Sequence, residues 1–136
     1  MSQDLLREID SLAESHTVAR GTTLFRRGDP ASYVYIVRRG RIVLFWDEPA
    51  TVRRIDALTS GHIIGLPAAF NGQYSVSGKA VQESELGYVP TTKLMDLLAI
   101  KPNLLREVTR MLAEEVARMR EICARKSRTK GLGRVK

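Results

Sequence analysis

The hydrophobic pattern of the chain changes period twice. Apolar side chains in residues 3–14 recur every three or four positions, which predicts a short amphipathic helix. Between residues 22 and 89 the apolar runs become short and rich in β-branched or aromatic residues, and helical spacing returns over residues 92–125. The predicted order is therefore one helix, a series of short strands, and two closing helices.

The middle of the chain predicts an all-antiparallel architecture. Its apolar runs are separated by Gly, Pro, Asn and Asp clusters, and short strands at such spacing are typical of a barrel or sandwich. The fold class is thus mainly β with flanking helices: an antiparallel β-roll or jelly-roll barrel. Arg39-Gly40, between two apolar runs, predicts a hairpin in which glycine supplies the positive φ. The predicted strands are 22–26, 33–37, 41–46, 51–56, 74–81 and 85–89.

The last helix is expected to run from Pro102 to about residue 125, because proline is tolerated at a first helical position. Its apolar stripe repeats every seven residues and is wider than one barrel surface would cover. We interpret the stripe as a homodimer seam, and packing on the chain's own barrel alone is the alternative. The predicted seam residues are Leu105, Val108, Leu112, Met119 and Ile122.

Charge is divided unevenly along the chain. The formal net charge is +7, yet residues 1–117 carry 14 basic and 14 acidic residues, so the excess belongs to the C-terminal end. This predicts a domain over 1–125 and a basic flexible tail over 126–136. Such a tail either favours the helix dipole and solubility or contacts nucleic acid, an anionic lipid surface or an acidic partner protein. The candidate polyanion contacts are Arg118, Arg120, Arg125, Lys126, Arg128 and Lys130.

Several classes of protein are disfavoured by composition. His16 and His62 are far apart and neither belongs to a cluster with metal-ligand spacing, so no metal site is predicted. No P-loop, nucleophile elbow or zinc motif occurs, which argues against an enzyme. A single cysteine, Cys123, fits a reducing compartment. With no apolar run of membrane-spanning length and no secretory signal, the cytoplasm is the expected location.

The segment TTLFRRGDPASYVYIVRRGRIVLF resembles the opening of the cyclic-nucleotide-binding domain family, and the resemblance extends over about residues 3–125. It is similar to the sensor domains of bacterial transcription regulators of the cyclic AMP receptor protein and fumarate–nitrate reductase regulator type. The resemblance implies a non-catalytic, dimeric, ligand-sensing module, in which Gly28, Asp29 and Gly40 carry backbone geometry. The matching residues are Phe25, Gly28, Asp29, Tyr35, Ile36, Gly40 and Val43.

The segment that would hold the nucleotide departs from the family pattern. In the family an arginine and backbone N–H groups hold the cyclic phosphate, and a carboxylate holds the ribose. Here Leu66 stands at the carboxylate position, Pro67 removes a donor, and Tyr74 stands at the arginine position. Cyclic AMP or another cyclic nucleotide is therefore disfavoured, no cofactor is assigned, and either a less polar ligand or the protein's own side chains fill the pocket. The candidate pocket residues are Gly65, Leu66, Pro67, Ala68, Tyr74, Ser75 and Val76.

Two questions stay open at this level. A replacement cation is one: Lys79 points away from the pocket if Tyr74 faces it, whereas Arg53 or Arg54 would point inward in a regular strand. The kind of protein is the other. No helix-turn-helix pattern follows residue 125, so the alternative is the sensor half of a cyclic-AMP-responsive DNA-binding regulator without that domain. An enzyme of the cupin type is excluded by the lack of a His and carboxylate metal set.

Overall fold

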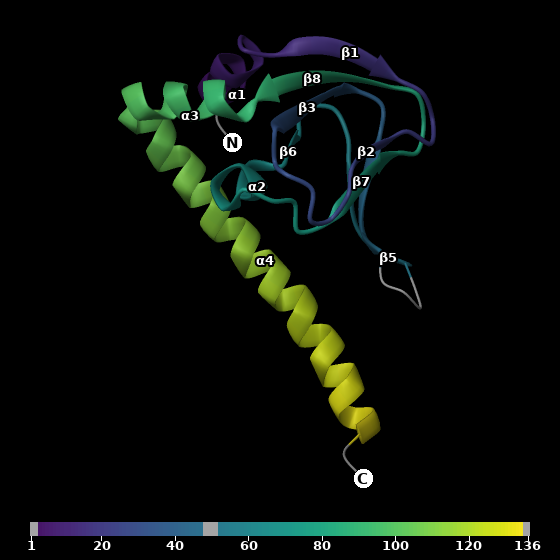
Figure 1. Cartoon of the computed structure of the whole chain (residues 1–136). Coiled ribbons are helices and arrows are strands. Elements are labelled where there is room, and N and C mark those ends of the chain that lie inside the picture. The colour runs from purple at the N-terminus through teal and green to yellow at the C-terminus, as the bar shows by residue number, and fades with distance from the viewer. Residues whose placement is uncertain (1–2, 48–51, 135–136) are drawn as a thin grey trace.

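The computed structural model describes residues 3–47 and 52–134 and shows two antiparallel sheets with helices gathered at one end (Figure 1). This confirms the predicted mainly β fold with flanking helices. The helices are α1 (Gln3–Asp10), α2 (Leu66–Asn71), α3 (Thr91–Ile100) and α4 (Pro102–Arg134). The strands are β1 (Glu14–Val18), β2 (Thr23–Phe25), β3 (Tyr33–Arg39), β4 (Ile42–Asp47), β5 (Val52–Leu58), β6 (Ile63–Ile64), β7 (Ser77–Ala80) and β8 (Ser84–Pro90).

Each sheet has four strands. The first has the order β1-β8-β3-β6 and the second the order β2-β7-β4-β5, and the paired strands run antiparallel. Strands that are consecutive in the chain thus often lie in different sheets, as β3 and β4 do. The roll is closed by these crossovers and not by successive hairpins.

β3 is buried on both of its faces. Val34 and Ile36 belong to a cluster with the helices, whereas Tyr35 and Val37 belong to a second cluster inside the roll. Because successive side chains of a strand point to opposite faces, one apolar run serves both cores. The first sheet is therefore a wall between the helices and the interior of the roll.

The helices cover the outer face of this wall. Leu5 of α1, Leu94 of α3 and Val108 of α4 are completely buried there, and full burial of such a side chain contributes about 1.5–3 kcal/mol. The ion pairs Arg38–Asp10 (2.8 Å) and Lys101–Glu8 (2.7 Å) also tie α1 to the roll and to the end of α3. Both pairs are partly exposed, so apolar burial dominates the attachment.

α4 continues to Arg134, past the end expected near residue 125, and extends away from the roll (Figure 1). Residues 126–134 of the predicted flexible tail are thus helical. Lysine and arginine are good helix formers, and glycines such as Gly131 cost only about 1 kcal/mol each in a helix interior. The division of the chain into a domain over 1–125 and a tail over 126–136 stays a prediction.

Three short elements were not predicted from the sequence: β1, β6 and α2. β1 is almost entirely exposed and polar, so it lacks an apolar alternation, and β6 has only two residues. Two predicted elements are too long, since α1 ends at Asp10 and β7 starts at Ser77. Each of these boundaries depends on tertiary pairing, which local periodicity does not report.

The turn at Arg39-Gly40 is only partly as predicted. Gly40 has φ 107°, so the expected positive φ is confirmed. The hairpin is wrong, because β3 and β4 belong to different sheets and pair with β8 and β7 instead. A Cβ atom built at Gly40 would lie 2.6 Å from the Cα of Ser84. Glycine is thus required both by its φ and by the close approach of another chain segment.

We predict that Gly40→Ala destabilises the protein far more than Gly61→Ala. Both glycines have positive φ, which costs an L-residue about 1–2 kcal/mol, but a Cβ at Gly61 would meet nothing within 4 Å. The overlap with Ser84 adds about 1–3 kcal/mol at Gly40. Urea unfolding of the two variants measures the difference, and equal losses of free energy would contradict the steric account.

Candidate functional site

A cavity of about 790 Å³ lies between the second sheet, α2 and α4. Its walls come from β4, β5 and β6, from α2, from the loop before β7, and from the middle of α4. Figure 1 shows α2 placed between the roll and α4, and residues of α2 line the cavity. Its volume is within the range of small-molecule sites.

The candidate pocket residues all line this one cavity. They come from the end of β6, from α2 and from the loop that precedes β7. The structure thus places together the residues that the sequence analysis assigned to one pocket. That they bind a ligand stays a prediction. The seven residues are Gly65, Leu66, Pro67, Ala68, Tyr74, Ser75 and Val76.

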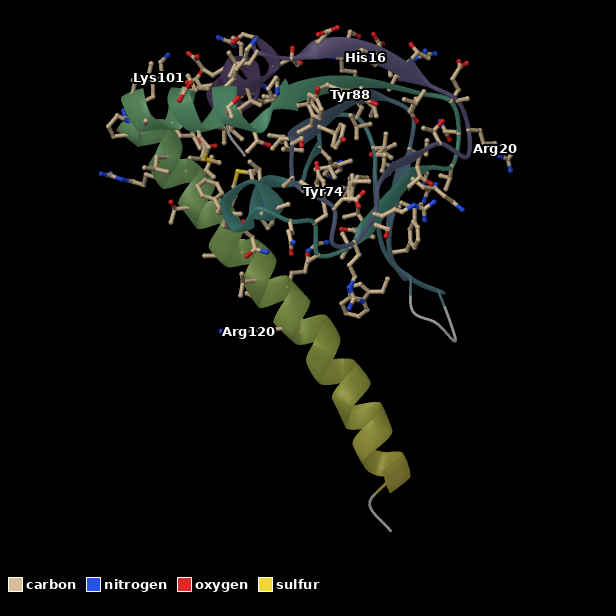
Figure 2. All side chains as sticks on the ribbon, in the orientation of Figure 1. His16, Arg20, Tyr74, Tyr88, Lys101 and Arg120 are labelled. Atoms are coloured by element: carbon tan, nitrogen blue, oxygen red, sulfur yellow. The ribbon has the colours of Figure 1, made fainter. Side chains whose placement is uncertain are left out.

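Tyr74 forms the inner wall of the cavity and is held from several sides; Figure 2 shows it within the roll. Its carbonyl accepts the Gly28 N–H at 2.8 Å and its N–H donates to the Asp29 carbonyl at 3.1 Å. Its hydroxyl donates to the Tyr33 carbonyl at 2.5 Å, and its ring stacks on Phe25 with centroids 4.1 Å apart. The Gly28-Asp29 turn therefore serves to position this side chain.

The tyrosines around this wall remain uncharged near neutral pH. Burial raises the pKa of Tyr35 well above its usual value, and the neighbouring Tyr74 raises it further. Burial also raises the pKa of Tyr74, although its hydrogen bonds to Tyr35 and Tyr33 act in the opposite direction. The inner wall therefore offers an anion no positive charge, and the Tyr74 hydroxyl proton is already donated to the Tyr33 carbonyl.

The lining of the cavity also contains charged residues. Asp56 of β5 and Arg118 of α4 form an ion pair, and both line the cavity together with Arg120. The Asp56 side chain is 23% exposed and that of Arg118 is 43% exposed. Asp56 also accepts the Ala57 N–H at 2.9 Å. Figure 2 marks Arg120 on the stretch of α4 that has passed α2.

These charged residues were not part of the pocket predicted from the sequence. Arg118 and Arg120 were assigned to polyanion contacts, and Asp56 was not singled out. A signal existed for Arg118, since it follows Met111 by seven residues, close to two helical turns, so the two share one face of α4. Finding Asp56 as the partner of Arg118 required knowing that this part of α4 lies near β5.

The other candidate cations have different positions. The Lys79 ammonium lies 5.9 Å from the centroid of the Phe45 ring, and Lys79 is not among the cavity-lining residues. The side chains of Arg53 and Arg54 lie outside the described part of the structure. So do those of the remaining candidate polyanion contacts, for which that role stays a prediction: Arg125, Lys126, Arg128 and Lys130.

The predicted dimer seam is divided by the structure. Val108 is completely buried in the core of its own chain, so including it in the seam was wrong; its position faces α3 and the roll. Leu112 lines the cavity, whereas Leu105 is 40% exposed. The side chains of Met119 and Ile122 lie outside the described residues.

Two kinds of feature are absent from the residues that the structure describes. No group of three or more His, Cys, Asp and Glu side chains there is close enough to hold a metal ion. No helix in the same part of the chain has both the length and the apolar character needed to cross a bilayer.

Comparison with known proteins gives a consistent result. Residues 15–101 match the family model described as the cyclic nucleotide-binding domain. The chain is 27% identical over 118 residues to the transcriptional activator protein FnrA of Stutzerimonas stutzeri, covering 84% of this chain and 47% of that protein. It thus spans about half the length of the curated relatives it matches.

Solved structures show the same fold. The catabolite activator protein of Thermus thermophilus superposes with a TM-score of 0.80 at 20% identity, covering 93% of this chain and 61% of that one. The c-di-GMP-responsive regulator CLP of Xanthomonas campestris gives 0.77 at 18% identity, covering 99% and 66%. At these identities the likeness establishes the architecture alone.

We predict that Tyr74→Phe lowers the free energy of unfolding by about 1–3 kcal/mol, because the buried hydroxyl of Tyr74 satisfies the Tyr33 carbonyl. Tyr33→Phe is the matched control, since it removes the same hydroxyl from a side chain that is 40% exposed and should change stability by less than about 0.5 kcal/mol. Urea unfolding of both variants gives the comparison. A larger loss for Tyr33→Phe would refute the anchoring role of Tyr74.

Proposed function

We propose a ligand-sensing, non-catalytic regulatory function for this chain, which belongs to the cyclic nucleotide-binding domain family. The proposed ligand is a small molecule other than cyclic AMP or cyclic GMP. The observation that carries the proposal is the cavity of about 790 Å³, whose inner wall is the neutral, immobilised Tyr74. The sequence left open whether the protein's own side chains fill this pocket, and the volume of the cavity favours a ligand.

The chemistry of the inner wall argues against a cyclic mononucleotide held in the family manner. A cyclic phosphate placed beside Tyr74 would lose water without gaining a cation. A ribose hydroxyl at Leu66, which is 4% exposed, would meet hydrocarbon. Leaving such groups poorly paired costs on the order of several kcal/mol, so affinity falls at least about a hundredfold.

The guanidinium groups of α4 do not restore that arrangement. Arg118 lines the cavity from α4, a different element from the loop that carries Tyr74, and is already paired with Asp56. A nucleotide that used Arg118 would have to bind in another orientation. The structure thus supports a changed ligand more than a conserved one.

We infer the wider role of the protein from its relatives. FnrA is named as a transcriptional activator, and the chain covers about half of it. We propose that this chain regulates transcription or another cytoplasmic process by sensing its ligand. The alternative is the sensor half of a cyclic-AMP-responsive transcription regulator, which requires that cyclic AMP bind.

Isothermal titration calorimetry with cyclic AMP and cyclic GMP separates these two functions. We expect no binding tighter than about 100 µM for either nucleotide, because the inner wall offers no cation. Micromolar binding of either nucleotide would overturn the proposal. In that case the same titration of Arg118→Gln would show whether α4 supplies the missing charge.

We also propose that the chain forms a homodimer through α4. Leu105 and Val116 are 40% and 51% exposed, and Ile100 beside the start of α4 is 75% exposed. A row of exposed apolar side chains along one helix is typical of a helix–helix interface. Burial of a few such residues only approximately balances the cost of association, so surfaces near α4 must contribute as well.

Leu105→Glu is expected to convert the dimer to a monomer at protein concentrations near 10 µM, since a charge would be buried at the seam. Asn103→Glu is the matched control: it adds the same charge to an exposed position two residues away, on the other side of α4. Sedimentation velocity measures the mass of each. A wild-type monomer, or a Leu105→Glu protein that remains dimeric, would rule out this seam.

A further inference from the structure

We propose that the cavity selects a small molecule with an apolar body and one anionic head group, and that this head group replaces Asp56 as the partner of Arg118. The inference rests on the proposed ligand-sensing function and adds the chemical class of the ligand. Its basis is a cavity lining that is mostly apolar but also contains the ion pair of Asp56 and Arg118, together with Arg120.

The apolar part of the lining fits an apolar body. Most of the lining side chains are aromatic or aliphatic and come from both sheets and from α4, and Tyr74 is among them. Its hydroxyl is occupied by the Tyr33 carbonyl, so it does not call for a polar ligand atom. The apolar lining includes Phe25, Leu44, Leu58, Ile64, Met111 and Leu112.

The charged residues of the lining fit one anion. Among the residues that line the cavity, Arg118 and Arg120 carry two positive charges and Asp56 carries one negative charge, so the lining is positive on balance. The other titratable side chain in the lining besides Tyr74 is His62, whose Nδ1 is engaged with the Thr59 backbone. A cationic ligand head would thus be repelled, a neutral head would gain little, and an anionic head would be attracted.

Asp56 shows how such a head would be held. One of its carboxylate oxygens pairs with the Arg118 guanidinium. A planar guanidinium can donate hydrogen bonds to any carboxylate or similar oxyanion in the same way. A ligand anion can therefore take the place of Asp56 without a new geometry at Arg118. The displaced Asp56 keeps one hydrogen bond, from the Ala57 N–H, and is partly exposed to water.

The exchange makes Asp56 a competitor of the ligand. Removing its charge should therefore strengthen the binding of an anionic ligand, whereas removing the charge of Arg118 should weaken it. A site in which Asp56 merely supports the fold would not give opposite signs. This pair of opposite effects is the signature of the proposal.

Two fluorescent probes with the same body test it. The first, 1-anilinonaphthalene-8-sulfonate, carries a sulfonate on an apolar aromatic body. The second, N-phenyl-1-naphthylamine, has the same body without the sulfonate and is neutral. We expect the wild type to bind the anionic probe about tenfold more tightly than the neutral one. Asp56→Asn should bind the anionic probe at least about threefold more tightly than wild type, and Arg118→Gln about tenfold more weakly. Neutral-probe binding should change less than twofold in either variant.

Controls keep the outcome interpretable. Arg110→Gln removes an exposed arginine of α4 that does not line the cavity, and it should bind both probes as the wild type does. Arg118→Lys should retain part of the preference for the anion, because it keeps the charge. Thermal unfolding followed by circular dichroism verifies that each variant is folded.

The possible failures are distinguishable. If neither probe binds the wild type, the proposed ligand-sensing function itself fails. If the neutral probe binds and the anionic probe shows no preference, or if Asp56→Asn and Arg118→Gln change anion binding in the same direction, only the exchange at Arg118 is refuted.

Discussion

The position of Tyr74 is the constraint on which the site depends. Gly28 and Asp29 bind its backbone, the Tyr33 carbonyl accepts its hydroxyl, and Phe25 stacks on its ring. Moving this side chain aside would break its hydrogen bond to Tyr33 and its stacking on Phe25. The turn that carries the family resemblance therefore holds an uncharged side chain at the position that we match to the family's arginine.

The fold was predictable because its main signals are local. The change from helical spacing to short β-branched runs and back identified most of the elements, and the apolar run of β3 supplied side chains to both cores. The strands that the sequence did not predict have little apolar content, as in β1, or only two residues, as in β6. The hairpin at Gly40 was misassigned since its φ is a local property, whereas the sheet that β4 joins is decided by its pairing with β7 and β5.

The site was predictable in one half only. Residues 65–68 and 74–76 were grouped by resemblance to a family segment, and they do line one cavity. The pair of Asp56 and Arg118 joins positions 62 residues apart in the chain, and no sequence pattern predicts that these two residues meet. Val108 and Arg118 lie at different levels of α4, so Val108 packs in the core with α1, α3 and the first sheet while Arg118 lines the cavity.

We infer that this pocket prefers an apolar anion to a cyclic mononucleotide. Native mass spectrometry of the wild-type chain mixed with equimolar cyclic AMP, cyclic GMP and 1-anilinonaphthalene-8-sulfonate compares the three directly in one spectrum. We expect an adduct with the mass of the sulfonate, one per chain. An adduct with the mass of either nucleotide as the main species would contradict it.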